Sequence, residues 1–126
     1  LIPLEYRTHK GAGADYSAIL ILPDPVLAGE VFEIRHVLEL KDAFTSRNEW
    51  VTLMVEYPTE SFRLEIIIPP GRRILGSRRE ESMGPSNSVN KRRVVPHTIP
   101  ETGRISLLWE QEEPITGRAY TLYWDW

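Results

Sequence analysis

The chain has 126 residues, a formal net charge of −3, 41% hydrophobic residues and 26% charged residues. This composition excludes a disordered chain, and the length suits one domain with a core of its own. The absence of cysteine excludes disulfides, thiolate metal sites and thiol nucleophiles. The longest apolar runs, SAILILP and LEIIIPP, have the length of strands and not of membrane spans.

Period-two alternation of apolar and polar residues runs through most of the chain and predicts antiparallel strands with one covered face. Stretches rich in proline and glycine interrupt the alternation at short intervals. The expected strands, in chain order, are 3–9, 16–22, 30–40, 50–57, 61–68, 72–79, 92–98, 104–110 and 118–125. This spacing predicts an all-β, antiparallel β-sandwich of immunoglobulin-like character with about seven to nine strands, and a barrel is the alternative. The segment 83–90 is the expected loop.

Two pairs of successive strands are expected to form hairpins. Only a short turn separates 50–57 from 61–68, and another separates 104–110 from 118–126. The last strand is therefore expected to pair with 104–110. The residues expected to fill the core from this strand are Tyr120, Leu122, Trp124 and Trp126.

The opposite face of the last strand predicts a second feature. Tyr123 lies there, and Leu108 and Ile67 lie on the corresponding faces of their own strands. If the three side chains form one exposed patch, we expect that patch to be a protein interface.

No catalytic or metal-binding pattern stands out. His9, His36 and His97 are far apart and lack zinc-site spacing. His36 lies on the apolar face of 30–40 and is interpreted as a core or edge histidine, whereas His97 is interpreted as a loop histidine or an anion contact. There is no GxSxG elbow, phosphate loop or calcium loop. We therefore expect no enzyme, cofactor or metal, and a hydrolase or sugar-active enzyme is the third alternative because carboxylate pairs assemble only in space.

One segment departs from the acidic character of the chain. Residues 72–93 hold seven basic and two acidic residues, a net charge of +5, which leaves −8 for the remainder. Such a patch attracts a phosphate-bearing ligand, nucleic acid or an acidic partner surface, and arginine suits bidentate anion recognition. The alternative is that these residues neutralise acidic neighbours. No aromatic residue interrupts the segment, which argues against a stacking platform for single strands. The candidate binding residues are Arg72, Arg73, Arg78, Arg79, Lys91, Arg92 and Arg93.

Two stretches, EYPTESFRLEIIIPPGRR (56–73) and RISLLWEQEEPITGRAYTLYWDW (104–126), resemble the uncharacterised β-sandwich modules at the C-terminal ends of large bacterial multidomain signalling or defence proteins. The resemblance covers about a third of the chain. The resemblance implies a β-sandwich fold and an accessory role, and it provides no catalytic residues. The matching positions are turn and core residues, namely Pro58, Pro69, Gly71, Trp109, Pro114, Gly117, Tyr120 and Trp124.

The expected function is that of a non-catalytic interaction or sensing module in a larger bacterial multidomain protein. Its partner would be another protein or a neighbouring domain of the same chain. The alternative is anion or nucleic-acid binding through 72–93. Because the chain begins at Leu1 without methionine, residues 1–126 are expected to be a single domain cut from a longer chain. The lack of cysteine favours a cytoplasmic location without membrane contact.

Overall fold

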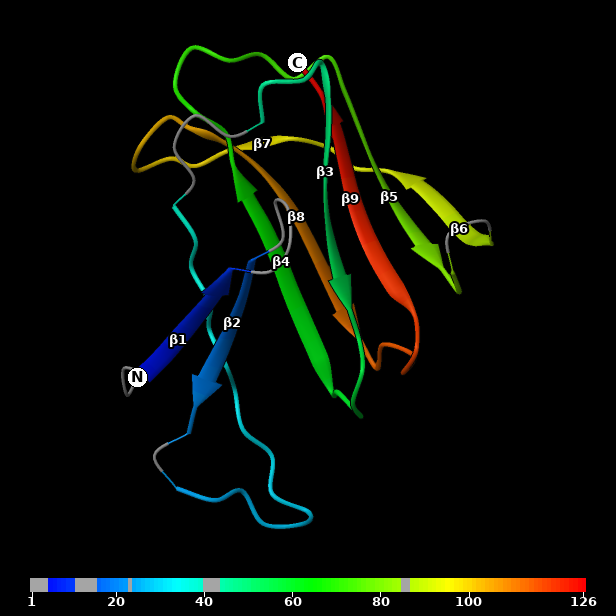
Figure 1. The fold of residues 1–126 in the computed structure, drawn as a ribbon. Helices are drawn as coiled ribbons and strands as arrows, with labels where there is room; N and C mark the ends of the chain where they lie inside the picture. Colours follow the sequence, from blue (N-terminus) through cyan, green and yellow to red (C-terminus); the bar gives the residue numbers. More distant parts are fainter. Residues whose placement is uncertain (1–4, 11–15, 23, 40–43, 85–86) are drawn as a thin grey trace. The chain divides into compact units, whose positions relative to one another are not determined.

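The computed structural model describes residues 5–10, 16–22, 24–39, 44–84 and 87–126. The chain divides into two compact units, Leu1–Glu39 and Leu40–Trp126. The interpretation of residues 1–126 as a single domain stays a prediction. Strands are the regular structure of the described residues, which contain no helix (Figure 1).

The first unit contains one pair of strands. Strand β1 (Glu5–Lys10) runs antiparallel to β2 (Tyr16–Ile21), with Glu5 opposite Ile21 and Lys10 opposite Tyr16. This pair matches the strands expected at 3–9 and 16–22.

The prediction of a strand at 30–40 is wrong for residues 30–39, and residue 40 lies outside the described ranges. Residues 30–39 belong to no ladder, and all their side chains are exposed, including Phe32 and Leu38. His36 is exposed as well, so its interpretation as a core or edge histidine is also wrong. The physical reason is that a strand needs a neighbour for its backbone N–H and C=O groups. Alternation gives a segment two faces but does not provide that neighbour.

The second unit is a β-sandwich of seven strands in two antiparallel sheets that pack against each other (Figure 1). The strand order is β3-β9-β5-β6 in one sheet and β4-β8-β7 in the other. This arrangement confirms the all-β antiparallel sandwich, whereas its immunoglobulin-like character stays a prediction. The strands are β3 (Asn48–Met54), β4 (Ser61–Ile67), β5 (Gly76–Ser82), β6 (Ser88–Arg93), β7 (His97–Thr98), β8 (Ile105–Glu112) and β9 (Ala119–Asp125).

The prediction of two hairpins is wrong. Strands β3 and β4 belong to different sheets, and so do β8 and β9. Strand β3 pairs with β9, with Val51 opposite Leu122, while β4 pairs with β8, with Leu64 opposite Trp109. The short connections after β3 and β8 therefore cross from one sheet to the other. The alternation of apolar and polar residues is the same whether two successive strands form a hairpin or lie in different sheets. The crossing places the apolar faces of β8 and β9 against each other, so that Trp109 contacts Tyr120 across the sandwich.

Several boundaries also differ from expectation. The strand expected at 72–79 begins only at Gly76, and the strand expected at 92–98 is divided between β6 and β7. The chain leaves the four-stranded sheet at Val94, whose N–H donates to the Ser77 carbonyl oxygen at 3.2 Å. Pro96, which has no N–H to donate, lies in the crossing segment. The expected loop 83–90 is shorter because β6 begins at Ser88, and residues 85–86 lie outside the described ranges.

Alternate residues of β9 fill the core, as the sequence predicts. Tyr120, Leu122 and Trp124 are at most 1% exposed, while Trp126 is half-buried. Across the sandwich, Trp109 of β8 meets Tyr120 edge to face, with ring centroids 5.4 Å apart. Tyr120 and Trp124 are therefore core residues, and Trp126 packs against the core.

The connection into β9 is stabilised by the same tyrosine. The Ile115 N–H donates to Tyr120 Oη at 2.8 Å. Gly117 has a φ of 87° and is the third residue of the turn in which the Arg118 N–H donates to the Ile115 carbonyl oxygen at 3.2 Å. A type II turn requires this positive φ, which favours glycine.

Candidate functional site

The basic segment folds as the edge of the four-stranded sheet. Strand β5 carries Arg78 and Arg79, and β6 carries Lys91, Arg92 and Arg93. Arg72 and Arg73 lie in the loop before β5. The antiparallel β5–β6 pair therefore brings together five of the seven predicted residues.

Four arginines oppose each other directly across β5 and β6. Arg78 is the partner of Arg93, and Arg79 is the partner of Arg92. Residues directly opposite in an antiparallel pair share a face and are in close proximity, and like charges in such positions repel. Successive residues of a strand point to opposite faces, so Arg78 and Arg93 share the outer face of the sheet, whereas Arg79 and Arg92 share the inner one. Each pair raises the positive potential on its own face, which an anion would relieve.

The outer face of the sheet carries a row of four side chains across all four strands. Trp50 of β3 is opposite Tyr123 of β9, Tyr123 is opposite Arg78, and Arg78 is opposite Arg93. Trp50 is 60% exposed, Arg78 and Arg93 are exposed, and Tyr123 is half-buried. We call Trp50, Tyr123, Arg78 and Arg93 the outer row.

The aromatic part of this row was missed by sequence reasoning. Trp50 and Tyr123 belong to strands far from 72–93 in the chain, so the absence of aromatic residues within that segment was a poor guide. The available signal was the alternation itself, because Val51 and Leu122 face inward and their neighbours must face outward. The register between β3, β9 and β5 then aligns these outward residues with Arg78.

The expected patch of Tyr123, Leu108 and Ile67 does not form. Tyr123 belongs to the four-stranded sheet, whereas Leu108 and Ile67 belong to β8 and β4 of the three-stranded sheet. Their faces point away from each other on opposite sides of the sandwich. The pairing of β9 with β3 and β5, and not with β8, is the reason.

Three arginines lie over aromatic rings. The Arg78 guanidinium carbon is 4.1 Å from the centroid of the Tyr123 ring on the outer face. Arg79 lies over Trp109 at 5.2 Å, and Arg72 lies over Trp126 at 4.9 Å. A guanidinium held over a ring loses less side-chain freedom when its N–H groups bind an anion.

Neutralisation by acidic neighbours accounts for little of the cluster. Lys91 forms a salt bridge with Glu80, at 3.6 Å. Glu81 pairs instead with Arg118, at 3.1 Å, which lies outside the basic segment. Within the part of the chain that the structure describes, Lys91 is the one predicted residue with a carboxylate partner.

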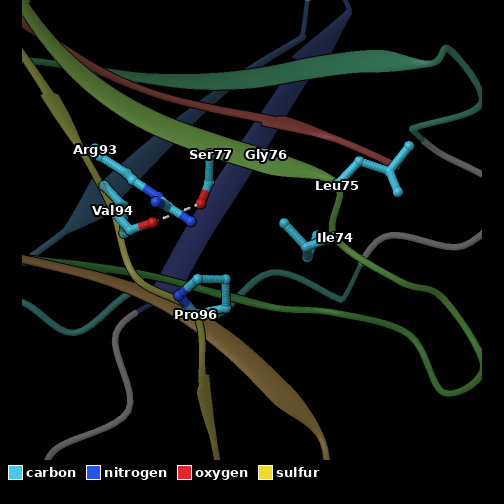
Figure 2. A pocket seen from close by; sticks show the side chains of 7 residues that line it. All are labelled: Ile74, Leu75, Gly76, Ser77, Arg93, Val94 and Pro96. Carbon is cyan, nitrogen blue, oxygen red and sulfur yellow. Dashed lines mark hydrogen bonds between the residues drawn. The ribbon is translucent and has the colours of Figure 1, made fainter.

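The basic edge borders a shallow hollow and not a deep cleft. The hollow has a volume of about 190 Å³, and a second hollow has about 210 Å³, both below the usual range for small-molecule sites. Figure 2 shows that the Ser77 hydroxyl in the first hollow donates to the Val94 carbonyl oxygen, at 2.8 Å. Its lining residues are Ile74, Leu75, Gly76, Ser77, Arg93, Val94 and Pro96. The open face is therefore the better candidate for a site.

A serine and a histidine meet elsewhere in the sandwich. Ser106 Oγ of β8 lies 2.8 Å from His97 Nε2 of β7, a distance at which a catalytic serine and its base also lie. Ser106 is 0% exposed, and neither hollow is lined by these residues. The described residues place no carboxylate in a hydrogen bond with His97. We therefore interpret the pair as a structural hydrogen bond that joins β7 to β8.

Replacing His97 with alanine is expected to lower the free energy of unfolding by about 1–3 kcal/mol, because the buried Ser106 hydroxyl loses its partner. Urea unfolding followed by circular dichroism measures this change. The double variant His97→Ala/Ser106→Ala removes both polar groups and is expected to recover part of the loss. A double variant less stable than His97→Ala would contradict this interpretation.

Two features are absent from the described ranges, namely a cluster of three metal ligands and a membrane-spanning helix. No group of three or more histidine, aspartate or glutamate side chains lies close enough there to hold a metal ion. No helix in those ranges has the length and apolar content to cross a membrane.

Fold and surface together define a β-sandwich with an open sheet face that is both basic and aromatic. No family model, no curated protein and no solved structure matches the chain. The functional argument therefore rests on the chemistry of this face.

Proposed function

We propose that the sandwich is a non-catalytic binding module that holds a phosphate-bearing anion on the outer face of β5 and β6. The observation that carries this proposal is the direct opposition of Arg78 to Arg93. Phosphate oxygens that accept hydrogen bonds from two facing guanidiniums replace repulsion with charge-assisted bonds. The stacking of Arg78 on Tyr123 at 4.1 Å prepares one half of this clamp.

The surrounding charges fit an exposed site of this kind. Lys91 lies on the same face as Arg78 and Arg93, two positions further along the β5–β6 pair, where Glu80 is its opposite residue. Asp125 brings a carboxylate to the face on the other side of the row, next to Gly76. An anion is therefore expected to lie on the Lys91 side of the row, away from Asp125.

Calorimetric titration with inorganic tripolyphosphate tests the proposal. The wild-type chain is expected to bind with an affinity that falls as ionic strength rises. The double variant Arg78→Ala/Arg93→Ala is expected to bind at least about tenfold more weakly, since each charge-assisted hydrogen bond contributes about 1.5–3 kcal/mol.

The matched control is Arg35→Ala/Arg63→Ala. It removes the same charge from two exposed arginines outside the site and is expected to bind nearly as well as the wild type. An equal loss of affinity in both double variants would mean that binding depends only on net charge, which would contradict the proposed site. Absence of salt-sensitive binding by the wild type at low ionic strength would end the proposal altogether.

A protein partner or neighbouring domain is the second candidate. Trp50 and Met54 are 60% and 56% exposed on the same outer face, and aromatic residues with arginine are enriched in interface centres. The resemblance of 56–73 and 104–126 to C-terminal modules of bacterial signalling or defence proteins supports an accessory role in such a protein, in the cytoplasm. An acidic partner surface would meet the arginines in the same way as a phosphate.

A further inference from the structure

We propose that the ligand of the outer row is single-stranded nucleic acid, with a base stacked on Trp50 and the phosphate backbone held by Arg78 and Arg93. This inference rests on the proposed function and adds the class of ligand. What carries it is the alignment of a free aromatic ring with two arginines in one row across the sheet. A site that binds only phosphate does not need an aromatic ring.

The row has the dimensions of a short strand of nucleic acid. Neighbouring strands in a sheet lie about 4.8 Å apart, so the four positions from Trp50 to Arg93 span about 14 Å. This length corresponds to roughly four stacked nucleotides at 3.4 Å each. The two hollows of about 190 and 210 Å³ are not lined by Trp50, Tyr123 or Arg78, so a flexible strand can lie across these three residues.

Each member of the row has a separate role. Trp50 is 60% exposed and provides a wide π surface for any base. Tyr123 is half-buried beneath the Arg78 guanidinium, and so it acts by positioning that arginine. Arg78 presents its own plane to a base or its edge to a phosphate, and both contacts are common in the recognition of single strands. Arg93 at the sheet edge supplies the second cation.

Base stacking favours this ligand over the alternatives. A duplex keeps its bases paired and inaccessible to a single flat ring, so it would engage only the cations. An acidic peptide would likewise pair with Arg78 and Arg93, and it would give Trp50 no regular partner. The contribution of the bases to binding affinity therefore distinguishes single strands from other polyanions.

Fluorescence anisotropy with a labelled oligothymidylate of about 12 nucleotides tests the inference. The probe for comparison is an abasic oligomer of the same length, which carries the same phosphates without bases. The wild-type chain is expected to bind oligothymidylate more tightly than the abasic oligomer. Trp50→Ala is expected to weaken oligothymidylate binding by roughly 5- to 150-fold and to leave abasic binding unchanged. Quenching of tryptophan fluorescence by oligothymidylate is expected to disappear in the same variant.

The control is Tyr57→Ala, which removes an aromatic ring that is 75% exposed and lies outside the row. It is expected to bind both oligomers as the wild type does. For Arg78→Ala/Arg93→Ala, the slope of log affinity against log salt is expected to fall by about 1.4.

Two results would overturn the inference and leave the proposed function intact. One is tripolyphosphate binding together with equal affinity for the abasic oligomer and oligothymidylate. The other is a duplex, or an oligoglutamate peptide of similar length, that binds as tightly as oligothymidylate. Absence of binding by tripolyphosphate and both oligomers would instead end the proposed function itself.

Discussion

Replacing Trp124 with alanine is expected to lower the free energy of unfolding by about 3–5 kcal/mol, the usual loss for a fully buried aromatic side chain. Trp124 is 1% exposed. Its ring meets Phe44 edge to face at 5.0 Å and Trp126 at 6.1 Å. The Trp124 indole N–H has no hydrogen-bond partner within the described residues, so the loss is one of packing and apolar burial. Urea unfolding followed by far-ultraviolet circular dichroism measures it without relying on the removed fluorophore.

The matched control is Trp50→Ala, which removes the same side chain from an exposed position. Its effect on stability is expected to stay within about 0.5 kcal/mol, as for most surface substitutions. Similar losses in both variants would contradict the assignment of Trp124 to the core and Trp50 to the surface. The same Trp50 variant serves in the binding assays, where an unchanged stability makes a loss of affinity interpretable.

Replacing Glu81 with glutamine is expected to lower the free energy of unfolding by about 2–4 kcal/mol. Glu81 and Arg118 form a salt bridge of 3.1 Å, and their side chains are only 16% and 19% exposed. Removal of one partner from a buried pair leaves the other charge uncompensated, at a cost of about 3–5 kcal/mol. Partial exposure reduces the expected cost. Arg118 Nε already lacks a hydrogen-bond partner within the described residues, which leaves Glu81 as the main compensation for this charge.

An exposed pair provides the comparison. Arg63 and Glu110 lie 3.4 Å apart, with side chains 58% and 61% exposed. Glu110→Gln is therefore expected to cost at most about 1 kcal/mol. The double variant Glu81→Leu/Arg118→Met should be more stable than Glu81→Gln if the penalty comes from an unpaired charge. Equal effects of Glu81→Gln and Glu110→Gln in urea unfolding would rule out this electrostatic explanation.

The faces of the sandwich strands were predictable, but their neighbours were not. Alternation correctly placed Leu122 and Trp124 inside, because successive side chains of a strand point to opposite faces. It did not reveal that β9 pairs with β3 and β5, since the same pattern suits a strand in either sheet. The segment 30–39 shows the limit most clearly, because its alternation is regular and yet it pairs with nothing.

The candidate site was predictable only in part for the same reason. The charge of 72–93 is a property of composition and is visible in the sequence. The opposition of Arg78 to Arg93 depends on the register of β5 and β6. The addition of Trp50 depends on β9 lying between β3 and β5, and no local pattern encodes that order.

The predictable properties of this protein are its antiparallel strands, the burial of Tyr120 and Trp124 in its last strand, and a basic segment within an acidic chain. These properties follow from alternation, hydrophobicity and charge, which act locally. Only the tertiary structure decided which strands are neighbours and which side chains share the outer row. The physical reason is that strand pairing joins residues distant in the chain, and burial over the whole sandwich selects one order among many that satisfy the same local pattern.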